Sequence, residues 1–518
     1  NNPAHDLRTD LVPGYAGTNV ARLLHFFTMS DVHLADKESP TQGNWLGWTA
    51  NYGKGQQTIA SWSPVKISTT QVLDAAVRTI NALHEVLSYD FGMSLGDQSD
   101  NNQYNELRWF IDCLDGKVIV PSSGAHAGAT TVDYQMPFQA QGLNRSIPWY
   151  AMLGNHDHVW QGACYQNSRS IAALVGASQL TVDLANLANM LSILNAPAPG
   201  KGFYMGVVDG TTPYGTVVEY GLEAEGKVNP TVAPDPDRRT LESYTTASDG
   251  TVAITSTTLG FMQEFFNTTS SPVGHGFKPD NLANDVAYYA FVPKSSIPIK
   301  VIVLNDNPQT SAGPNFAYAS LDPPGSKTQF NWLQNELDQG QAAGQLMVIA
   351  AHIPINPQAS LTDPQTYVSN PTRANLIWND PSEQQAVLDL LHGYPNFILW
   401  LAGHRHVNVI TPQPRTNPAQ ASPGFWEVET PSLRDFPQGF RDIEIRRNSD
   451  NTVSILVTTA APAVVPGTPS GKSRDYSIGA AQTCGIYTST ASQIYNAELV
   501  VPLTPAMQTI IAGCGSPL

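Results

Sequence analysis

A short apolar run that stops at a glycine, asparagine, aspartate or histidine recurs along the chain, and this unit constrains the fold more than any other feature. It is seen in LLHFFTMSDVH (23–33), FGMSLGDQSDN (91–101), IPWYAMLGNHD (147–157), IKVIVLND (299–306), QLMVIAAHIP (345–354) and FILWLAGHRHVNV (397–409). Apolar runs of this length without alternation are typical of strands that are buried on both faces, and such strands need covering layers.

Helical patterns lie between several of these runs. The segment 69–87 has the period of an amphipathic helix, and its apolar face consists of Leu73, Ala76, Val77, Ile80, Leu83 and Leu87. A second helix is expected over 382–393, because Ser382 and Gln385 have the spacing of a capping box and Gly393 ends the pattern. Strands that alternate with helices predict an α/β fold.

Three strand patterns follow one another near the C-terminus with only short turns between them. They are GFWEVETPS (424–432), FRDIEIRRN (440–448) and TVSILVTTA (452–460). This spacing is typical of antiparallel hairpins. The sheet system is therefore expected to be mixed.

Residues 160–285 are rich in Gly, Pro, Thr and Asn, and we interpret them as an insertion over the site, with a peripheral subdomain as the alternative. The chain from 461 to 518 is expected to be a tail that packs on a domain of residues 20–460. His275, in the insertion, and Trp45 and Trp48, in a Gly-rich loop, are candidates for substrate contact. Ordinary packing is the alternative for all three.

Net charge excludes some classes of partner. The chain has 27 basic and 43 acidic residues, a formal net charge of −16, and no basic stripe. Docking on nucleic acid or on an anionic membrane through charge is therefore not expected. The longest apolar runs, such as LMVIA, are far shorter than the roughly 18 residues of a spanning helix. The sequence does not determine the oligomeric state.

The start of the chain and its cysteines favour an exported protein. It begins NNPAHDL and is rich in Gly (40) and Pro (39) but poor in Lys, as a processed exported protein would be, although a trimmed chain would look the same. Its four cysteines form no CxxC motif, so their even number suggests two disulfides. Sequence order favours Cys113 with Cys164 and Cys484 with Cys514; four unrelated thiols are the alternative.

Side chains with metal-binding chemistry gather where the apolar runs end. Loops beyond the carboxyl ends of strands converge in an open α/β sheet, so these residues are expected to meet in space. His404 and His406, two residues apart, would lie on one face of an extended segment and suggest a shared ligand. Imidazoles, carboxylates and an amide suit Zn, Mn or Fe, and the ligands are numerous enough for two ions that share a carboxylate. The candidates are Asp31, His33, Asp97, Asp100, Asn101, Asn155, His156, Asp157, His352, His404 and His406.

The ordered series DVH, GDQSDN, GNHD, AH and GHRH resembles the five-block signature of the calcineurin-like metallophosphoesterases, and the match spans about residues 23–410. GDQSDNNQYNELRW further resembles a bacterial, often exported branch of that family. The resemblance implies a four-layer α/β/β/α sandwich of two mixed sheets flanked by helices. It also implies two divalent or trivalent ions and hydrolysis of a small phosphorylated substrate by in-line attack of a hydroxide that bridges them.

The resemblance also implies a role for each matching residue. Asp31, His33 and His406 would hold the first ion, Asp97 would bridge both ions, and Asn155, His352 and His404 would complete the second site. His156 would contact the phosphate and protonate the leaving oxygen, with Asp157 beside it in proton handling. Purple acid phosphatases have a glycine where this chain has His33 and a metal-bound tyrosine where it has Asp100, so an iron–tyrosinate enzyme is disfavoured.

Three further residues are candidates for substrate contact. Arg405 would point away from its neighbouring histidines along an extended segment, and a structural ion pair is its alternative. His158 follows the GNHD block and would face either the phosphate or solvent. Asn101 closes the GDQSDN block.

Three functions stay open. The first is a dinuclear phosphoesterase, in which a phosphodiester or nucleotide-like substrate is favoured over a monoester. The second is a metal- or phosphate-binding protein without catalysis, against which the intact His156 and Asp157 argue. The third is a mononuclear zinc hydrolase that acts on amides or esters.

Overall fold

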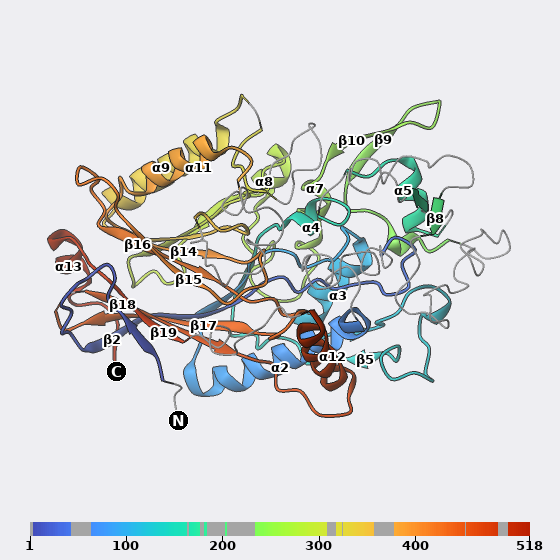
Figure 1. Cartoon of the computed structure of the whole chain (residues 1–518), viewed down its shortest axis with the longest axis horizontal. Helices are drawn as coiled ribbons and strands as arrows, with labels where there is room; N and C mark the ends of the chain where they lie inside the picture. Colours follow the sequence, from blue (N-terminus) through green and yellow to red (C-terminus); the bar gives the residue numbers. More distant parts are fainter. Residues whose placement is uncertain are drawn as a thin grey trace.

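Two mixed β-sheets pack face to face between layers of helices in the computed structural model (Figure 1). The structure describes residues 4–42, 64–162, 165–176, 181–183, 202–204, 234–307, 318–323, 325–356, 378–450, 452–484 and 496–518. Trp45, Trp48 and Cys164 lie outside these residues, as does the side chain of Cys484. The expected α/β/β/α layering with two mixed sheets is confirmed.

The first sheet has the order β1-β19-β18-β17-β2-β3-β6, and β20 pairs with β2. Strands β2, β3 and β6 run parallel, β17 and β18 are antiparallel to their neighbours in the strand order, and β19 is antiparallel to β18 but parallel to β1. The parallel part places the ends of three of the predicted strands side by side. The strands are β1 (Asp6–Arg8), β2 (Asn19–Met29), β3 (Phe91–Ser94), β6 (Trp149–Ala151), β17 (Phe440–Asn448), β18 (Val453–Ala460), β19 (Ala497–Val501) and β20 (Ser516–Pro517).

The second sheet has the order β11-β12-β13-β14-β16-β15. Strands β12, β13, β14 and β16 are parallel, and the edge strands β11 and β15 are antiparallel. Its central strands are buried along their whole length, as their continuous apolar runs predict. The strands are β11 (Tyr289–Phe291), β12 (Ile299–Val303), β13 (Leu346–Ala350), β14 (Phe397–Ala402), β15 (Ile410–Pro414) and β16 (Gly424–Glu429).

Helices form the outer layers. In Figure 1, α2 and α12 lie against the first sheet, and α9 and α11 lie beyond the second. Helix α2 has the predicted bounds, and Leu73, Ala76, Val77 and Ile80 on its apolar face are fully buried. The principal helices are α2 (Thr69–Leu87), α3 (Tyr104–Asp115), α9 (Thr328–Ala342), α11 (Pro381–Leu391) and α12 (Pro469–Cys484).

Shorter elements complete the described part of the chain. They are β4 (Val118–Ile119), β5 (Phe138–Gln139), α4 (Asn155–His158), α5 (Ser168–Leu174), β7 (Thr181–Asp183), β8 (Gly202–Tyr204), β9 (Ser243–Thr246), β10 (Val252–Ser256), α7 (Leu259–Glu264), α8 (Pro279–Asn284) and α13 (Pro505–Ile511), with 3-10 turns η2 (Pro64–Ser68), η3 (Gly124–His126) and η6 (Pro236–Arg238). None of the helices in this part of the chain combines the length and apolar character that a membrane crossing requires.

Two local predictions are wrong. Strand β16 does not form a hairpin with β17, because it pairs in parallel with β14 and the chain then crosses to the other sheet through residues 430–439. Only β17 and β18 form the expected hairpin. Helix α11 begins at Pro381 rather than Ser382, since the Asp380 side chain accepts a hydrogen bond from the Ser382 N–H and caps the helix.

Part of the predicted insertion belongs to the core. The backbone N–H groups of Trp149 and Ala151, in edge strand β6, donate to the carbonyls of Ser271 and His275. The His275 ring is buried and stacks on Trp149 with ring centroids 3.5 Å apart. His275 is therefore a packing residue, which is the alternative that the sequence left open.

The C-terminal residues do more than cover the domain. Strand β19 lies inside the first sheet, between β18 and β1, and α12 packs against α2 and η2. The residues predicted as a tail thus contribute a strand to a sheet that begins near the N-terminus, although the boundary at residue 461 stays a prediction.

The predicted disulfides are wrong. The Cys113 thiol is free and fully buried on the inner face of α3, and Cys514 is also free. Burial raises the pKa of the Cys113 thiol well above its usual value, so this thiol packs as a small apolar group. The expectation of export therefore loses its support from the cysteines.

Candidate metal centre

The loops that follow parallel strands of both sheets meet at one place. Asp31 follows β2, Asp97 follows β3 and Asn155 follows β6 in the first sheet, while His352 follows β13 and His404 follows β14 in the second. Backbone hydrogen bonds join these loops: Asp31 N donates to Gly96 O, and Gly403 N donates to His352 O. Side chains far apart in sequence are thereby brought into contact.

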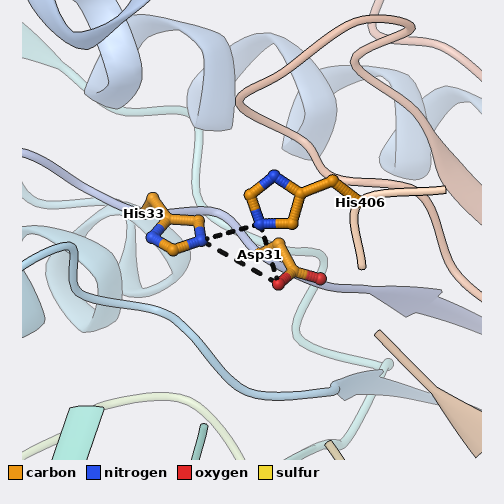
Figure 2. A group of neighbouring side chains, drawn as sticks. All are labelled: Asp31, His33 and His406. Atoms are coloured by element: carbon orange, nitrogen blue, oxygen red, sulfur yellow. Dashed lines mark hydrogen bonds and ion pairs between the residues drawn. The ribbon is translucent and has the colours of Figure 1, made fainter. Parts of the chain in front are cut away.

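The first group of side chains is Asp31, His33 and His406 (Figure 2). Nε2 of His406 lies 3.2 Å from Oδ1 of Asp31 and 3.1 Å from Nε2 of His33. Nε2 of His33 lies 3.9 Å from the same Asp31 oxygen. Asp31 and His33 are buried, so the three ligand atoms converge away from bulk solvent.

The second group is Asp97, Asn155, His352 and His404. Nε2 of His352 lies 3.1 Å from Oδ1 of Asn155, and Nδ1 of His404 lies 3.2 Å from that same oxygen. Oδ2 of Asp97 is 3.3 Å from Nε2 of His352 and 3.4 Å from Nε2 of His33. One carboxylate oxygen thus faces a histidine of each group.

Hydrogen bonds around the second group turn the ligand atoms inward. Nδ1 of His352 donates to the Leu95 carbonyl at 2.7 Å, which directs Nε2 toward Asp97 and Asn155. The Asn155 amide donates through Nδ2 to Gly162 O at 3.0 Å, which turns Oδ1 toward the two imidazoles. Carboxylate, amide and imidazole ligand atoms that converge on one place fit a cation, which would displace the proton from the imidazole.

The pKa shifts follow from the same crowding. Burial opposes a charge on His352 and His406, but Asp97 and Asp31 raise the pKa of His352 to about 10, and Asp31 and Asp435 raise the pKa of His406 to about 9. Burial instead lowers the pKa of His33 and of His404 to about 3. One histidine in each group thus carries a proton at the position where an ion would supply positive charge.

Left-handed backbone conformations are concentrated at the centre. The φ angles of Asp31, His33, Asp97, His404 and His406 lie between 45° and 67°. A non-glycine residue in this region costs about 1–3 kcal/mol and persists only where the surrounding structure imposes it. The extended segment predicted for His404 and His406 is therefore wrong: β14 ends at Ala402, and the two imidazoles enter different groups from a loop.

The glycines of the motifs make room for the ligands. A Cβ atom on Gly154 would lie 2.2 Å from Oδ1 of Asp97. A Cβ on Gly403 would lie 2.6 Å from Oδ2 of Asp31, and one on Gly96 would lie 2.5 Å from Nδ1 of His352. Each distance is shorter than a real Cβ contact, so the glycine before each ligand in GD, GNHD and GH is required by close packing.

His156 and Asp157 are neighbours in sequence but have different surroundings. Nδ1 of His156 donates to Asp100 O at 2.6 Å, and its ring meets the His33 ring edge-on with centroids 4.5 Å apart. Both oxygens of Asp157 accept hydrogen bonds from backbone N–H groups, of Gln98 and Gly154 on one oxygen and of Ser99 on the other. The Asp157 carboxylate thus ties two site loops together.

The three residues predicted to contact substrate have protein partners. Nε and Nη2 of Arg405 each donate to a Glu429 oxygen at 2.6 Å. His158 is buried, with Nδ1 2.8 Å from Thr257 Oγ1 and Nε2 3.2 Å from Asn305 Oδ1. Asn101 donates to Thr41 Oγ1 at 3.0 Å. These contacts favour the structural alternative for Arg405.

Sequence reasoning missed two carboxylates that accept hydrogen bonds from proposed ligand residues. Asp435 accepts from Nδ1 of His406 at 2.6 Å, and Asp306 accepts from the backbone N–H groups of His352 and Ile353. Asp306 ends one of the apolar runs, which was a usable signal. Asp435 lies in a segment without a motif, and only the folded chain places it beside His406.

The fold and the site define an α/β protein with a candidate centre for metal ions. No protein-family model matches the chain, and the comparison with curated proteins gives no match. Among solved structures, the chain is similar to a dimetal phosphatase from Danio rerio at 12% identity, with 85% of this chain and 97% of that chain covered and a TM-score of 0.38. It is also similar to GAP50 of Plasmodium, described as the anchor in the inner membrane complex, at 9% identity, with 96% of each chain covered and a TM-score of 0.32. Likeness of this degree carries no argument about function.

Proposed function

We propose that this protein is a metal-dependent phosphoesterase with a dinuclear centre. The observation that carries the proposal is the position of Asp97, whose Oδ2 faces His33 at 3.4 Å and His352 at 3.3 Å. A carboxylate between two groups of imidazoles suits a pair of cations better than a single one. Zn, Mn and Fe all match this set of nitrogen and oxygen donors.

The proposed ligands divide between the two ions. Asp31, His33 and His406 would hold one, Asn155, His352 and His404 the other, and Asp97 would contact both. When bound, two such ions activate water and neutralise charge on a phosphoryl group. The buried side chains around them exclude bulk water, which strengthens every charge interaction in the centre.

His156 is the proposed proton donor to the leaving oxygen. The bond from its Nδ1 to the Asp100 carbonyl fixes the tautomer and leaves Nε2 as the exchangeable nitrogen. Asp157, which we expected to share this role, is instead proposed to position the loops, since its carboxylate is buried and accepts hydrogen bonds from them. Burial, together with the charge of Asp97, raises the pKa of Asp157 to about 7.

The pairing of nearby cations supports a phosphodiester rather than a monoester. Lys66 and Arg434 both contact Asp100, and Arg405 contacts Glu429. A monoester dianion needs more compensating positive charge than a diester monoanion. The positive charges of these side chains already neutralise buried carboxylates. The proposed substrates include nucleotide-like phosphodiesters.

Turnover of two chromogenic esters tests the function. The chain is freed of metal with a chelator, loaded with Zn²⁺ or Mn²⁺, and assayed with bis-p-nitrophenyl phosphate and with p-nitrophenyl phosphate. We expect metal-dependent turnover of both and a higher kcat/KM for the diester. A higher kcat/KM for the monoester would overturn the substrate preference. No turnover of either by the fully loaded protein would overturn the enzyme assignment.

A further inference from the structure

In the first group a carboxylate lies beside the outer ring nitrogen of each histidine, whereas in the second group no carboxylate of the described residues lies there, since Asp306 contacts the backbone of His352 and not its ring. Nδ1 of His33 lies 3.2 Å from Oδ1 of Asp100, and Nδ1 of His406 lies 2.6 Å from Oδ2 of Asp435. In the second group, Nδ1 of His352 instead donates to a backbone carbonyl. A carboxylate behind a ligating histidine orients the ring and makes the inner nitrogen more basic.

A single arginine joins the two backing carboxylates. Nη1 of Arg434 donates to the same Asp100 oxygen that faces His33, and Nη2 lies 3.3 Å from the same Asp435 oxygen that faces His406. The Arg434 side chain is buried, with 2% of its surface exposed. His33, Asp100, Arg434, Asp435 and His406 therefore form a continuous chain of polar contacts behind the first group.

The rest of the surroundings hold this chain in place. Nζ of Lys66 donates to the other Asp100 oxygen at 2.7 Å and to Gln42 Oε1 at 3.0 Å. Two cations thus balance the two backing carboxylates, which keeps both carboxylates anionic inside the protein. Of these cations, only the planar fork of an arginine can reach two carboxylates in fixed directions.

The path of the chain explains how Arg434 reaches this position. Residues 430–439 cross from β16 in the second sheet to β17 in the first. On the way they attach to the end of β2, since Leu433 N donates to Ser30 O and Ser432 Oγ donates to Asp31 O at 2.8 Å. The crossing therefore fixes Arg434 relative to the Asp31 loop before any ion binds.

We propose that Arg434 is a positioning residue that bridges Asp100 and Asp435 and thereby makes the Asp31–His33–His406 site the tighter of two ion sites. The proposal rests on the dinuclear centre of the proposed function. It goes beyond that function by assigning an unequal strength to the two sites and by naming the residue outside the ligand set that causes it. Among the residues that the structure describes, no such bridge reaches the Asn155–His352–His404 site, which would bind its ion more weakly.

Zinc titration of the chelator-treated full chain, followed by calorimetry with a competing chelator, tests the proposal without an assay of activity. The unaltered protein should bind two ions in two resolved steps. Arg434→Gln and Asp435→Asn should weaken the first step by about 10- to 100-fold, the range for residues behind metal ligands, and leave the second step unchanged. His404→Ala should weaken the second step alone.

A matched control separates this effect from the loss of any buried histidine–carboxylate pair. Asp442 lies 3.0 Å from Nε2 of His25 in the first sheet, away from the centre, so Asp442→Asn should leave both steps unchanged. Two equal steps in the unaltered protein, which require no variant to fold, would overturn the proposal, as would equal weakening of both steps by Arg434→Gln.

Parallel turnover assays keep the two proposals distinct. Ordered binding of two ions without phosphoesterase turnover would contradict the proposed function and support the role of Arg434. Phosphoesterase turnover together with two equal binding steps would support the proposed function and contradict the role of Arg434.

Discussion

Nε2 of His352 lies 3.3 Å from Oδ2 of Asp97, although the two residues are 255 positions apart in the sequence and follow strands of different sheets. The contact joins the two sheets, because Asp97 follows a strand of the first sheet and His352 follows a strand of the second. The centre therefore depends on how the sheets are packed, and changes at Asp97 should be felt on both sides of it.

Asp97→Asn should remove ions from both sites. The amide keeps the size of the side chain but loses the charge that faces His33 and His352. We expect turnover to fall by more than about 100-fold, since even residues behind metal ligands produce 10- to 100-fold effects. Elemental analysis after metal loading and gel filtration should find fewer than two ions per chain. Asp133→Asn, at an exposed carboxylate, is the control.

His156→Ala should lower kcat without loss of metal. A positioned acid or base contributes about 10²- to 10⁴-fold to a hydrolysis, and kcat should fall within that range. The ion content should stay at the level of the unaltered protein, because His156 is outside the proposed ligand set. Loss of an ion from this variant would instead make His156 a ligand, which its place beside His33 and Asp97 allows geometrically.

Gly154→Ala should damage the centre although it adds only a methyl group. That methyl group would lie 2.2 Å from Oδ1 and 2.3 Å from the backbone nitrogen of Asp97, so the two loops must move apart. We expect lower metal affinity and lower turnover. Gly513→Ala, where nothing lies within 4 Å of the added carbon, is the matched control and should change neither quantity.

Metal affinity should rise with pH. Without metal, Asp97 and Asp435 help to raise the pKa of His352 to about 10 and that of His406 to about 9, so both rings carry a proton at pH 7. An ion must displace these protons, so binding should release protons at pH 7 and strengthen up to about pH 9 to 10. Calorimetry in two buffers with different ionisation enthalpies measures the release. Binding heats that are the same in both buffers would contradict the expectation.

Glu242 should destabilise the protein as the pH rises. Burial raises the pKa of this carboxyl to about 8 from an ordinary 4.5, so the folded state holds a proton that the unfolded state has lost. Glu242 does not reduce the free energy of unfolding below pH 4.5, where the carboxyl is protonated in both states. The free energy of unfolding then falls as the pH rises from 4.5 toward 8. Glu242→Gln should raise the free energy of unfolding at pH 8 by about 2 kcal/mol or more, at about 1.4 kcal/mol per pKa unit. Urea denaturation at pH 8 measures this, and at pH 4 the two proteins should be equally stable.

The strand and helix patterns predict the layers of this fold because burial on both faces leaves a direct mark on the sequence. The 69–87 helix and the runs of β13 and β14 lie where their apolar residues indicate. Which neighbouring strand a given strand pairs with leaves no such mark on the sequence. β16 is as apolar as a hairpin strand would be, yet it joins the other sheet, since only the packing of whole layers decides its neighbour.

The motif residues meet as strand-end convergence predicts, but the reason given for His404 and His406 does not hold. Their left-handed φ angles of 67° and 57° arise from the contacts of the loop, which no local spacing encodes. Arg434 and Asp435 were missed for a related reason. They follow no glycine or apolar run that marks a site, and they reach the centre only because the chain crosses between the sheets beside Asp31.

The most direct test of the account is a crystal of the full chain grown with Mn²⁺ and measured for anomalous scattering. The account predicts two anomalous peaks, one beside Asp31, His33 and His406 and the other beside Asn155, His352 and His404, with Asp97 in contact with both. A single peak, or two peaks that do not share Asp97, would contradict it.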